Sequence, residues 1–202
     1  MRAWIGQVPG GLAIASVMAC AAFGAVTGSS IATVATMGAI IMPEMRRYGY
    51  NPRLATGALA ASGTLGILIP PSVIFIFYGV MTETSIGELF IAGIVPGLLT
   101  AFVSSATVLV RCLIDPTLGP PGPRATWSER WRATSGFVPI LVLFFAVMGG
   151  LYVGAFTPTE GAGVGCAGVL VIAALKRTAT LAAMARALEE TALISAMMFA
   201  II

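Results

Sequence analysis

Long apolar segments alternate with short charged ones along this chain. Five stretches contain no Asp, Glu, Lys or Arg: residues 3–43, 54–82, 89–110, 133–159 and 161–175. A sixth apolar run follows Glu190. Because a helix needs about 20 apolar residues to cross a bilayer core of about 30 Å, the pattern predicts an all-α polytopic membrane protein. We expect residues 89–110 and 136–156 each to cross once, and residues 161–175 to borrow the preceding turn.

The first apolar stretch is too long for one crossing. A single helix over residues 3–43 would be about 60 Å long, roughly twice the bilayer core. Arg2 precedes the stretch, and Arg46 and Arg47 follow it, so both ends favour the cytoplasm. We therefore expect an even number of passes. A re-entrant helical hairpin with its turn at residues 23–30 fits better than two full spans.

The charged segments alternate in sign, which predicts their side of the membrane. Segments 44–53, 111–135 and 176–190 are basic, whereas those at Glu83 and Glu160 contain no Lys or Arg. By the positive-inside rule the first three are cytoplasmic and the other two face outward. Four parts follow: a re-entrant hairpin (1–53), a discontinuous transmembrane helix (54–82), a transmembrane helix with a basic loop (83–135), and further transmembrane helices (136–202).

Composition agrees with a membrane protein and removes several classes of function. The chain is 58% hydrophobic and 9% charged, with a mean hydropathy of +0.98. It has no histidine, which excludes His-based acid–base catalysis and Ser–His nucleophiles. An intramembrane hydrolase using Ser29 or Ser30 would lack a base, so we expect neither enzyme activity nor catalytic residues. The net charge of +3 is too small for a nucleic-acid surface.

The cysteines do not indicate a metal centre or a disulfide framework. Cys20, Cys112 and Cys166 lie singly in apolar surroundings. We expect all three to be small buried hydrophobic residues.

Neutral oxygen atoms gather at the predicted hairpin turn, in the segment TGSSIAT. A glycine permits the turn, and hydroxyl groups lie beside backbone carbonyls that the turn frees. Such ligands suit sodium and avoid the desolvation cost of a buried carboxylate. The alternative is that the hydroxyls bond back to the preceding turn or hold helices together. The candidate ligands are Thr27, Gly28, Ser29, Ser30 and Thr33.

A second helix break is predicted in SGTLGILIPPS, residues 62–72. Two prolines remove two amide donors and force the preceding residue out of helical geometry, while two glycines loosen the turn before them. The alternative is a simple proline kink. An unwound stretch could line a binding site, and the half-helix after it could receive a substrate anion. The candidates are Ser62, Gly63, Thr64, Gly66, Pro70, Pro71 and Ser72.

Three other features have structural interpretations. In GAFTPTEG, residues 154–161, Glu160 suits the first turn of a helix capped by a threonine, and this capping role is favoured over binding. Gly150 and Gly154, spaced as G-x-x-x-G, indicate close helix packing. The loop of residues 115–135 is interpreted as a solvated connector whose tryptophans anchor it at the membrane interface.

Four segments, taken in order, resemble the large membrane subunit (the DctM-type permease) of tripartite ATP-independent periplasmic (TRAP) transporters, within the ion transporter superfamily. They are GAVTGSSIATVATMGAIIMPEMRRYGY, SGTLGILIPPSVIFIFYG, SIGELFIAGIVPGLL and FTPTEGAG. The resemblance runs along nearly the whole chain. It implies that the hairpin tip, residues 27–33, meets the broken helix, residues 62–72, to form a sodium site beside the substrate.

The same resemblance implies a mechanism and partners. The mechanism is sodium-coupled symport of an organic acid, such as a C4-dicarboxylate or sialic acid, by an elevator motion. The partners are a small membrane subunit, a periplasmic solute-binding protein and the lipid bilayer of the bacterial inner membrane. Sodium is the coupling ion, and no cofactor, other metal or nucleic acid is implied.

This chain departs from the family pattern in one respect. The second, inverted half, with its own hairpin and helix break, does not occur here, so we expect a fragment holding about half of the substrate site. Two alternatives stay open: a carrier of the same superfamily that needs no binding protein, and a purely structural membrane subunit.

Overall fold

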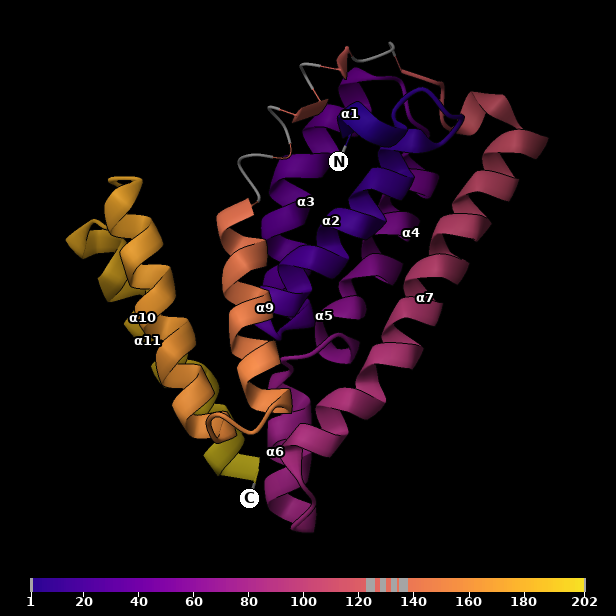
Figure 1. Ribbon diagram of the computed structural model, residues 1–202. Helices are drawn as coiled ribbons and strands as arrows, with labels where there is room; N and C mark the ends of the chain where they lie inside the picture. Colours follow the sequence, from indigo (N-terminus) through magenta and orange to yellow (C-terminus); the bar gives the residue numbers. More distant parts are fainter. Residues whose placement is uncertain (1, 123–125, 128–129, 132–133, 135–137, 202) are drawn as a thin grey trace. The chain divides into compact units, whose positions relative to one another are not determined.

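The computed structural model describes residues 2–122, 126–127, 130–131, 134 and 138–201, and every regular element within them is helical. Two compact units are present, Met1–Val138 and Pro139–Ile202. The first contains α1 (Arg2–Ile5), α2 (Gly11–Thr27), α3 (Ser30–Arg47), α4 (Pro52–Gly63), α5 (Leu65–Leu68), α6 (Val73–Thr82), α7 (Ile86–Ile114) and the 3₁₀ turn η1 (Pro116–Leu118) (Figure 1). The remaining helices are α9 (Val138–Tyr152), α10 (Pro158–Leu175) and α11 (Leu181–Ile201). The predicted all-α membrane fold is confirmed.

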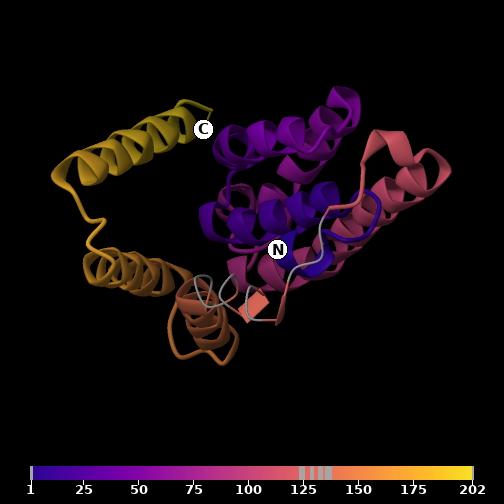
Figure 2. The same ribbon diagram turned by 90° about the horizontal axis from the view of Figure 1, so that it is seen from above.

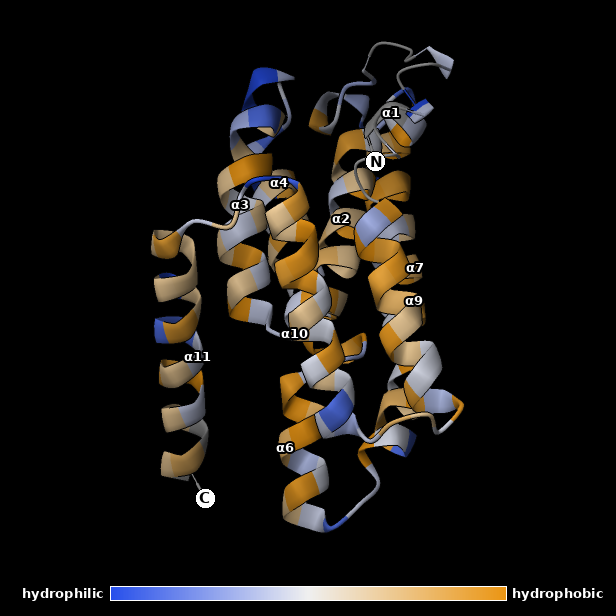
Figure 3. Ribbon diagram, turned by 60° about the vertical axis from the view of Figure 1, so that its left-hand side comes forward, coloured by the Kyte–Doolittle hydropathy of each residue, from blue (hydrophilic) through white to orange (hydrophobic). Residues whose placement is uncertain are grey.

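Among the described residues, two helices are long and apolar enough to cross a membrane: α7, with 29 residues, and α10, with 18. A third span is present if α4–α5 and α6, which meet at a bend of 42°, count as one broken helix. α7 is more apolar than α10, with a mean hydropathy of 2.0 against 1.5. Hydrophilic residues gather where α3 ends and α4 begins (Figure 3). As expected, α10 includes the turn before residue 161. α9 has 15 residues, about 22 Å, and is shorter than the predicted crossing of residues 136–156, of which 136–137 lie outside the described residues.

α2 and α3 form the predicted helical hairpin. Gly28 ends α2 in a left-handed conformation (φ 62°), and its N–H donates to the Gly24 carbonyl at 2.7 Å. α2 is enclosed by α3, α4, α5 and α7 (Figure 2). The hairpin tip ends level with the break between α5 and α6, and α6 continues beyond it (Figure 1). The hairpin therefore reaches only as far as the break in the neighbouring helix.

The buried face of α2 consists mostly of small side chains, which lets the neighbouring helices approach closely. They are Ala13, Ala15, Ser16, Val17, Cys20, Ala21 and Ala25.

A backbone strap closes the base of the hairpin. It is the segment of residues 116–122 that follows α7. Gly10 N–H donates to the Gly119 carbonyl (2.9 Å), and Gly122 N–H donates to the Gly6 carbonyl (2.7 Å). This part of the loop is therefore bonded to the hairpin base, although Pro116, Thr117 and Pro121 are exposed as a connector would be. The sequence concealed the strap because its bonds come from backbone atoms, which leave no side-chain pattern.

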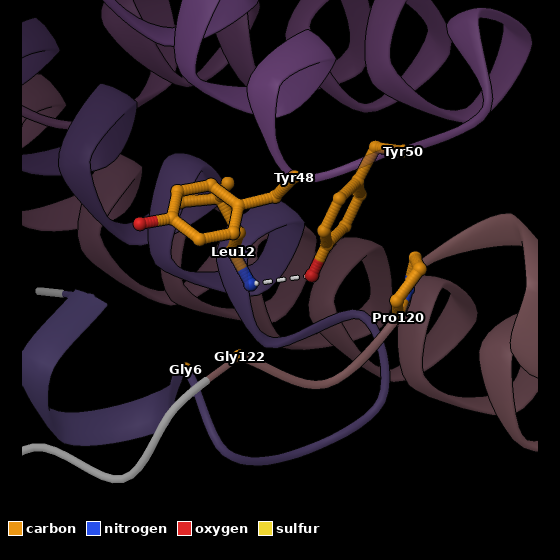
Figure 4. A pocket seen from close by; sticks show the side chains of 6 residues that line it. All are labelled: Gly6, Leu12, Tyr48, Tyr50, Pro120 and Gly122. Carbon is orange, nitrogen blue, oxygen red and sulfur yellow. Dashed lines mark hydrogen bonds between the residues drawn. The ribbon is translucent and has the colours of Figure 1, made fainter.

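The N-terminus of α2 is capped from a distant part of the chain. Its N-cap residue is a glycine without a capping side chain, so the first N–H groups need another acceptor. The Tyr50 hydroxyl accepts the Leu12 N–H at 3.0 Å, beside a small cavity with room for about one water molecule (Figure 4). Burial raises the pKa of the Tyr50 phenol, so the hydroxyl stays neutral. The tyrosine thus fixes where the hairpin begins.

In the second unit, α9 packs against α10 through glycines. Gly168 lies against Leu143, and the ring of Phe156 fills the space beside Gly150 and Gly161. Gly154 has φ 75° and no contact within 4 Å of the position a side chain would take. The predicted G-x-x-x-G packing is therefore wrong for Gly154, which lies in the turn after α9.

α10 begins with the predicted cap. Thr157 and Glu160 form a capping box in which the Glu160 carboxylate accepts the Thr157 N–H at 2.8 Å. Of the cysteines, Cys20 and Cys112 are buried as predicted, whereas Cys166 is exposed, contrary to expectation.

Candidate functional site

The hairpin tip is a tight turn made of one glycine and one serine. Gly28 supplies the left-handed conformation, and Ser29 follows in an extended conformation as the N-cap of α3. The Ser29 hydroxyl accepts the Ala32 N–H at 3.3 Å. Gly28 is thus required by the turn, and Ser29 by the helix that starts after it.

The helix break is shorter than the sequence predicts. Helical geometry continues from α4 through Thr64 (φ −64°, ψ −20°) into α5. The chain leaves it at Ile69 (ψ 121°), passes a cis Pro70–Pro71 bond and re-enters a helix after Ser72. The break therefore spans residues 69–72, not 62–72. The prolines interrupt the helix, whereas Gly63 and Gly66 remain helical.

Two glycines bring the tip onto the helix before the break. A methyl group on Gly24 would lie 2.6 Å from the Gly66 Cα. A methyl group on Gly66 would lie 2.8 Å from the Ser29 carbonyl oxygen and 2.9 Å from the Thr33 hydroxyl. Since atoms do not approach so closely without overlap, neither position has room for a side chain. Gly24 is a site residue that the sequence analysis missed, because a glycine inside a helix gives no sign of its partner.

The tip also touches the break itself. Val73 N–H donates to the Gly28 carbonyl at 3.3 Å. The Pro71 carbonyl oxygen lies 2.9 Å from where a Gly28 side chain would begin. The first free amide of α6 is therefore paired with the hairpin, and the two interruptions of helical structure lie together.

Oxygen atoms line this contact. Thr33 is fully buried, and its hydroxyl donates to the Ser29 carbonyl at 2.7 Å and lies 3.2 Å from the Thr27 hydroxyl. The carbonyls of Gly66 and Ile67 cannot receive the usual helical bond, because the residues four positions later are prolines.

Ser72 differs from the other hydroxyl-bearing residues at the contact. It is fully buried, and its hydroxyl has no hydrogen-bond partner among the described residues. A buried, unpaired hydroxyl at a helix break favours an additional ligand at that point.

Several predicted candidates lie apart from this contact. The Ser62 hydroxyl is buried and donates to the Ala58 carbonyl at 2.7 Å, and the exposed Thr64 hydroxyl donates to the Ala61 carbonyl at 2.7 Å. These two residues follow the alternative of bonding to the preceding turn. Gly63 lies against the Val34 side chain, with the Ser30 carbonyl 3.8 Å from the position of its missing side chain. The candidates that the structure brings together are Thr27, Gly28, Ser29, Thr33, Gly66, Pro70, Pro71 and Ser72.

A helical hairpin that meets a broken helix inside a bundle of apolar helices is typical of membrane transporters. The sequence model of the tripartite ATP-independent periplasmic transporter, DctM component, matches residues 1–202, and the chain belongs to this family. The family is one of transporter permeases, not of enzymes.

Curated relatives agree with this assignment. A C4-dicarboxylate TRAP transporter large permease protein of Pseudomonas aeruginosa is 44% identical over 163 residues, which cover 81% of this chain and 38% of the relative. An ectoine/5-hydroxyectoine TRAP transporter large permease protein of Ruegeria pomeroyi is 38% identical over 203 residues, which cover 100% of this chain and 47% of the relative. A 2,3-diketo-L-gulonate TRAP transporter large permease protein of Escherichia coli is 34% identical over 170 residues, which cover 84% of this chain and 39% of the relative. The chain thus spans less than half the length of each of these relatives.

Proposed function

We propose that this chain acts within the large membrane subunit of a sodium-coupled TRAP transporter that imports an organic acid. The observation that carries this proposal is the contact between hairpin tip and helix break, with its unpaired Ser72 hydroxyl. The substrates named for the relatives differ, from C4-dicarboxylates to ectoine and 2,3-diketo-L-gulonate, so we assign organic acids as a class. A periplasmic solute-binding protein would deliver the substrate, and a small membrane subunit would complete the complex in the bacterial inner membrane.

Sodium suits the chemistry of the contact. Carbonyl and hydroxyl oxygens are the ligands that a hard cation prefers, and they are neutral, so the empty site does not bury a charge. No group of three or more His, Cys, Asp or Glu that could hold a metal ion occurs in the described part of the chain, so a transition-metal centre has no support there. We propose that carbonyls freed at the tip and the break bind Na⁺ together with the Ser72 hydroxyl.

We propose an elevator motion, which the packing supports. Because Gly24, Gly66 and Gly28 hold the hairpin directly against the broken helix, the two are expected to move as one body. Opening the site by separating the tip from the break would cost their mutual contacts. Carrying the closed contact across the membrane would keep them.

Uptake measurements with the complete transporter test the proposal. The permease and its small subunit are reconstituted in proteoliposomes, with the binding protein and radiolabelled acid outside. An inward sodium gradient is expected to drive accumulation, whereas an equal potassium gradient at the same membrane potential is not. Accumulation that is the same with either gradient would reject sodium coupling.

A further inference from the structure

α1 lies at the end of the first unit where the hairpin has its base (Figure 1), and its Trp4 belongs to an aromatic and cationic cluster. The rings of Trp4 and Trp127 meet edge to face with centroids 5.7 Å apart. The Arg130 guanidinium lies 5.7 Å from each of these two ring centroids. Trp4 Nε1 donates to the Thr134 hydroxyl at 3.1 Å. The cluster thus joins α1 to the segment after the strap, which the transport proposal does not require.

The two tryptophans of this cluster, and Trp131 next to Arg130 in the sequence, are exposed. Trp4, Trp127 and Trp131 are 41%, 61% and 59% exposed. Indole rings are enriched where the acyl chains of a membrane meet its headgroups, since the ring is apolar and its N–H is polar. The three side chains therefore have the chemistry of a membrane interface.

Arg130 adds a positive charge to the same cluster. Its Nε is buried and has no hydrogen-bond partner among the described residues. A guanidinium held against indole rings is partly desolvated, which strengthens its attraction to an anion. Its planar fork matches the oxygens of a phosphate.

We propose that Trp4, Trp127, Arg130 and Trp131 bind the headgroup of an anionic phospholipid in the cytoplasmic leaflet. The guanidinium donates to the lipid phosphate, and the indoles contact the glycerol and the first acyl carbons. Charge complementarity favours this occupant, because the segment of residues 111–135 carries more Arg than Asp and Glu and is expected to face the negatively charged leaflet. Free phosphate would leave the exposed indoles without a partner. The proposal is independent of sodium coupling.

The chain offers a clean reporter for this site. It contains three tryptophans: Trp4 and Trp127 lie in the cluster, and Trp131 is the residue after Arg130, so tryptophan fluorescence reports on this region. The purified protein is placed in phosphatidylcholine bilayers that contain a small fraction of brominated phosphatidylglycerol or, separately, the same fraction of brominated phosphatidylcholine. We expect quenching by the anionic lipid at about fivefold lower mole fraction, the enrichment typical of one basic side chain near such a surface.

Two variants locate the preference. Arg130→Gln keeps all three tryptophans, and both brominated lipids are expected to quench their fluorescence equally. Arg53→Gln removes an exposed arginine at the start of α4 that contacts no aromatic ring among the described residues, and is expected to keep the wild-type preference. For the unaltered protein, raising the ionic strength should reduce the preference, which tests the electrostatic part without relying on a variant that must fold.

Five results would overturn the proposal. Equal quenching of the unaltered protein by both lipids would remove the preference itself, and a preference insensitive to salt would remove its electrostatic origin. Equal loss in both variants would assign it to diffuse charge. If added small subunit protected the tryptophans from quenching and left no lipid preference, the surface would belong to a protein partner. If millimolar inorganic phosphate abolished the lipid preference, the site would belong to a soluble anion.

Discussion

Gly66 shows how one missing side chain sets the geometry of the proposed site. The Ser29 carbonyl and the Thr33 hydroxyl occupy the space that a side chain at position 66 would need. Gly57, in α4, has no atom within 4 Å of the place where its own side chain would begin. The two glycines therefore have different roles: Gly66 lies in contact with the hairpin tip, whereas Gly57 is an exposed helical residue.

Gly66→Ala is expected to destabilise the protein by about 1–3 kcal/mol, because the new methyl group must push the tip away. It should also weaken the sodium dependence of uptake by the complete transporter. Thermal unfolding in detergent measures the first effect. Gly57→Ala is the matched control, and it should raise stability by up to about 1 kcal/mol through helix propensity. A Gly66→Ala protein as stable as the control would contradict the observed contact.

Ser72→Ala separates ion binding from stability. Because the Ser72 hydroxyl is buried without a partner, its removal should change unfolding in sodium-free buffer by no more than about 0.5 kcal/mol. A bound ion stabilises the folded state, so sodium should raise the melting temperature of the unaltered protein more than that of the variant. The measurement is the melting temperature in sodium chloride against choline chloride.

Ser62→Ala is the control for this experiment, since Ser62 is equally buried but bonds to its own helix. It should leave the sodium-induced shift unchanged. Ser29→Ala is less informative, because the Ser29 hydroxyl also caps α3. Equal shifts in the Ser72 and Ser62 variants would remove Ser72 from the proposed sodium ligands.

At the scale of helices, the cap of α10 carries a pH dependence. The Thr157 N–H and hydroxyl donate to the Glu160 carboxylate and hold its pKa below the usual 4.5. A lowered pKa means that the folded state prefers the ionised form. The cap therefore contributes fully above about pH 4.5 and loses its contribution as the pH falls through the lower pKa of the folded protein.

We expect amide exchange in the first turn of α10 to quicken relative to the rest of the helix as the pH falls through that range. Hydrogen exchange with intrinsic rates corrected for pH measures this. Glu160→Gln should show faster exchange at neutral pH and no such acid transition. An acid transition that persists in this variant would assign the effect to another carboxylate.

The helices themselves were largely predictable, and their contacts were not. The charge-free stretch of residues 3–43 predicted a hairpin with its turn at 23–30, and the turn lies at Gly28 and Ser29. The span predicted at residues 89–110 lies within α7. These predictions hold because charge is excluded from the bilayer and therefore marks segment ends. The same argument says nothing about which glycine faces which helix.

Within the proposed site, the prolines were informative and the hydroxyls were not. Pro70 and Pro71 locate the break because the missing N–H groups act locally. Ser62 and Ser72 look alike in the sequence, yet one bonds to its own helix and the other has no partner. That difference depends on tertiary packing. The site was thus predictable as two segments, but not as a set of ligands.

At the scale of the first unit, the hairpin is held at both ends. Its tip is bonded to α6 through Val73, and its base is bonded to the strap after α7 through Gly10 and Gly6. Cys112, near the end of α7, lies directly against Gly10. Hinge motion at the base would break these backbone bonds, whereas motion of the hairpin together with α7 would leave them intact.

A disulfide between the hairpin base and α7 tests whether they move together. A Gly10→Cys side chain would begin 3.2 Å from the Cys112 Cβ, near the separation of about 3.8 Å found in disulfides. The left-handed backbone at Gly10 adds a strain of about 1–2 kcal/mol, which the many contacts of α2 can offset. The experiment uses the complete transporter with Cys20→Ala and Cys166→Ala, so that within this chain only the new pair can react. Oxidation should cross-link Gly10→Cys to Cys112 and leave sodium-driven uptake within about twofold of that in the reduced sample. This corresponds to a change of no more than about 0.4 kcal/mol in activation free energy. Uptake that is abolished on oxidation and restored by reductant would show instead that the hairpin must hinge away from α7 at its base.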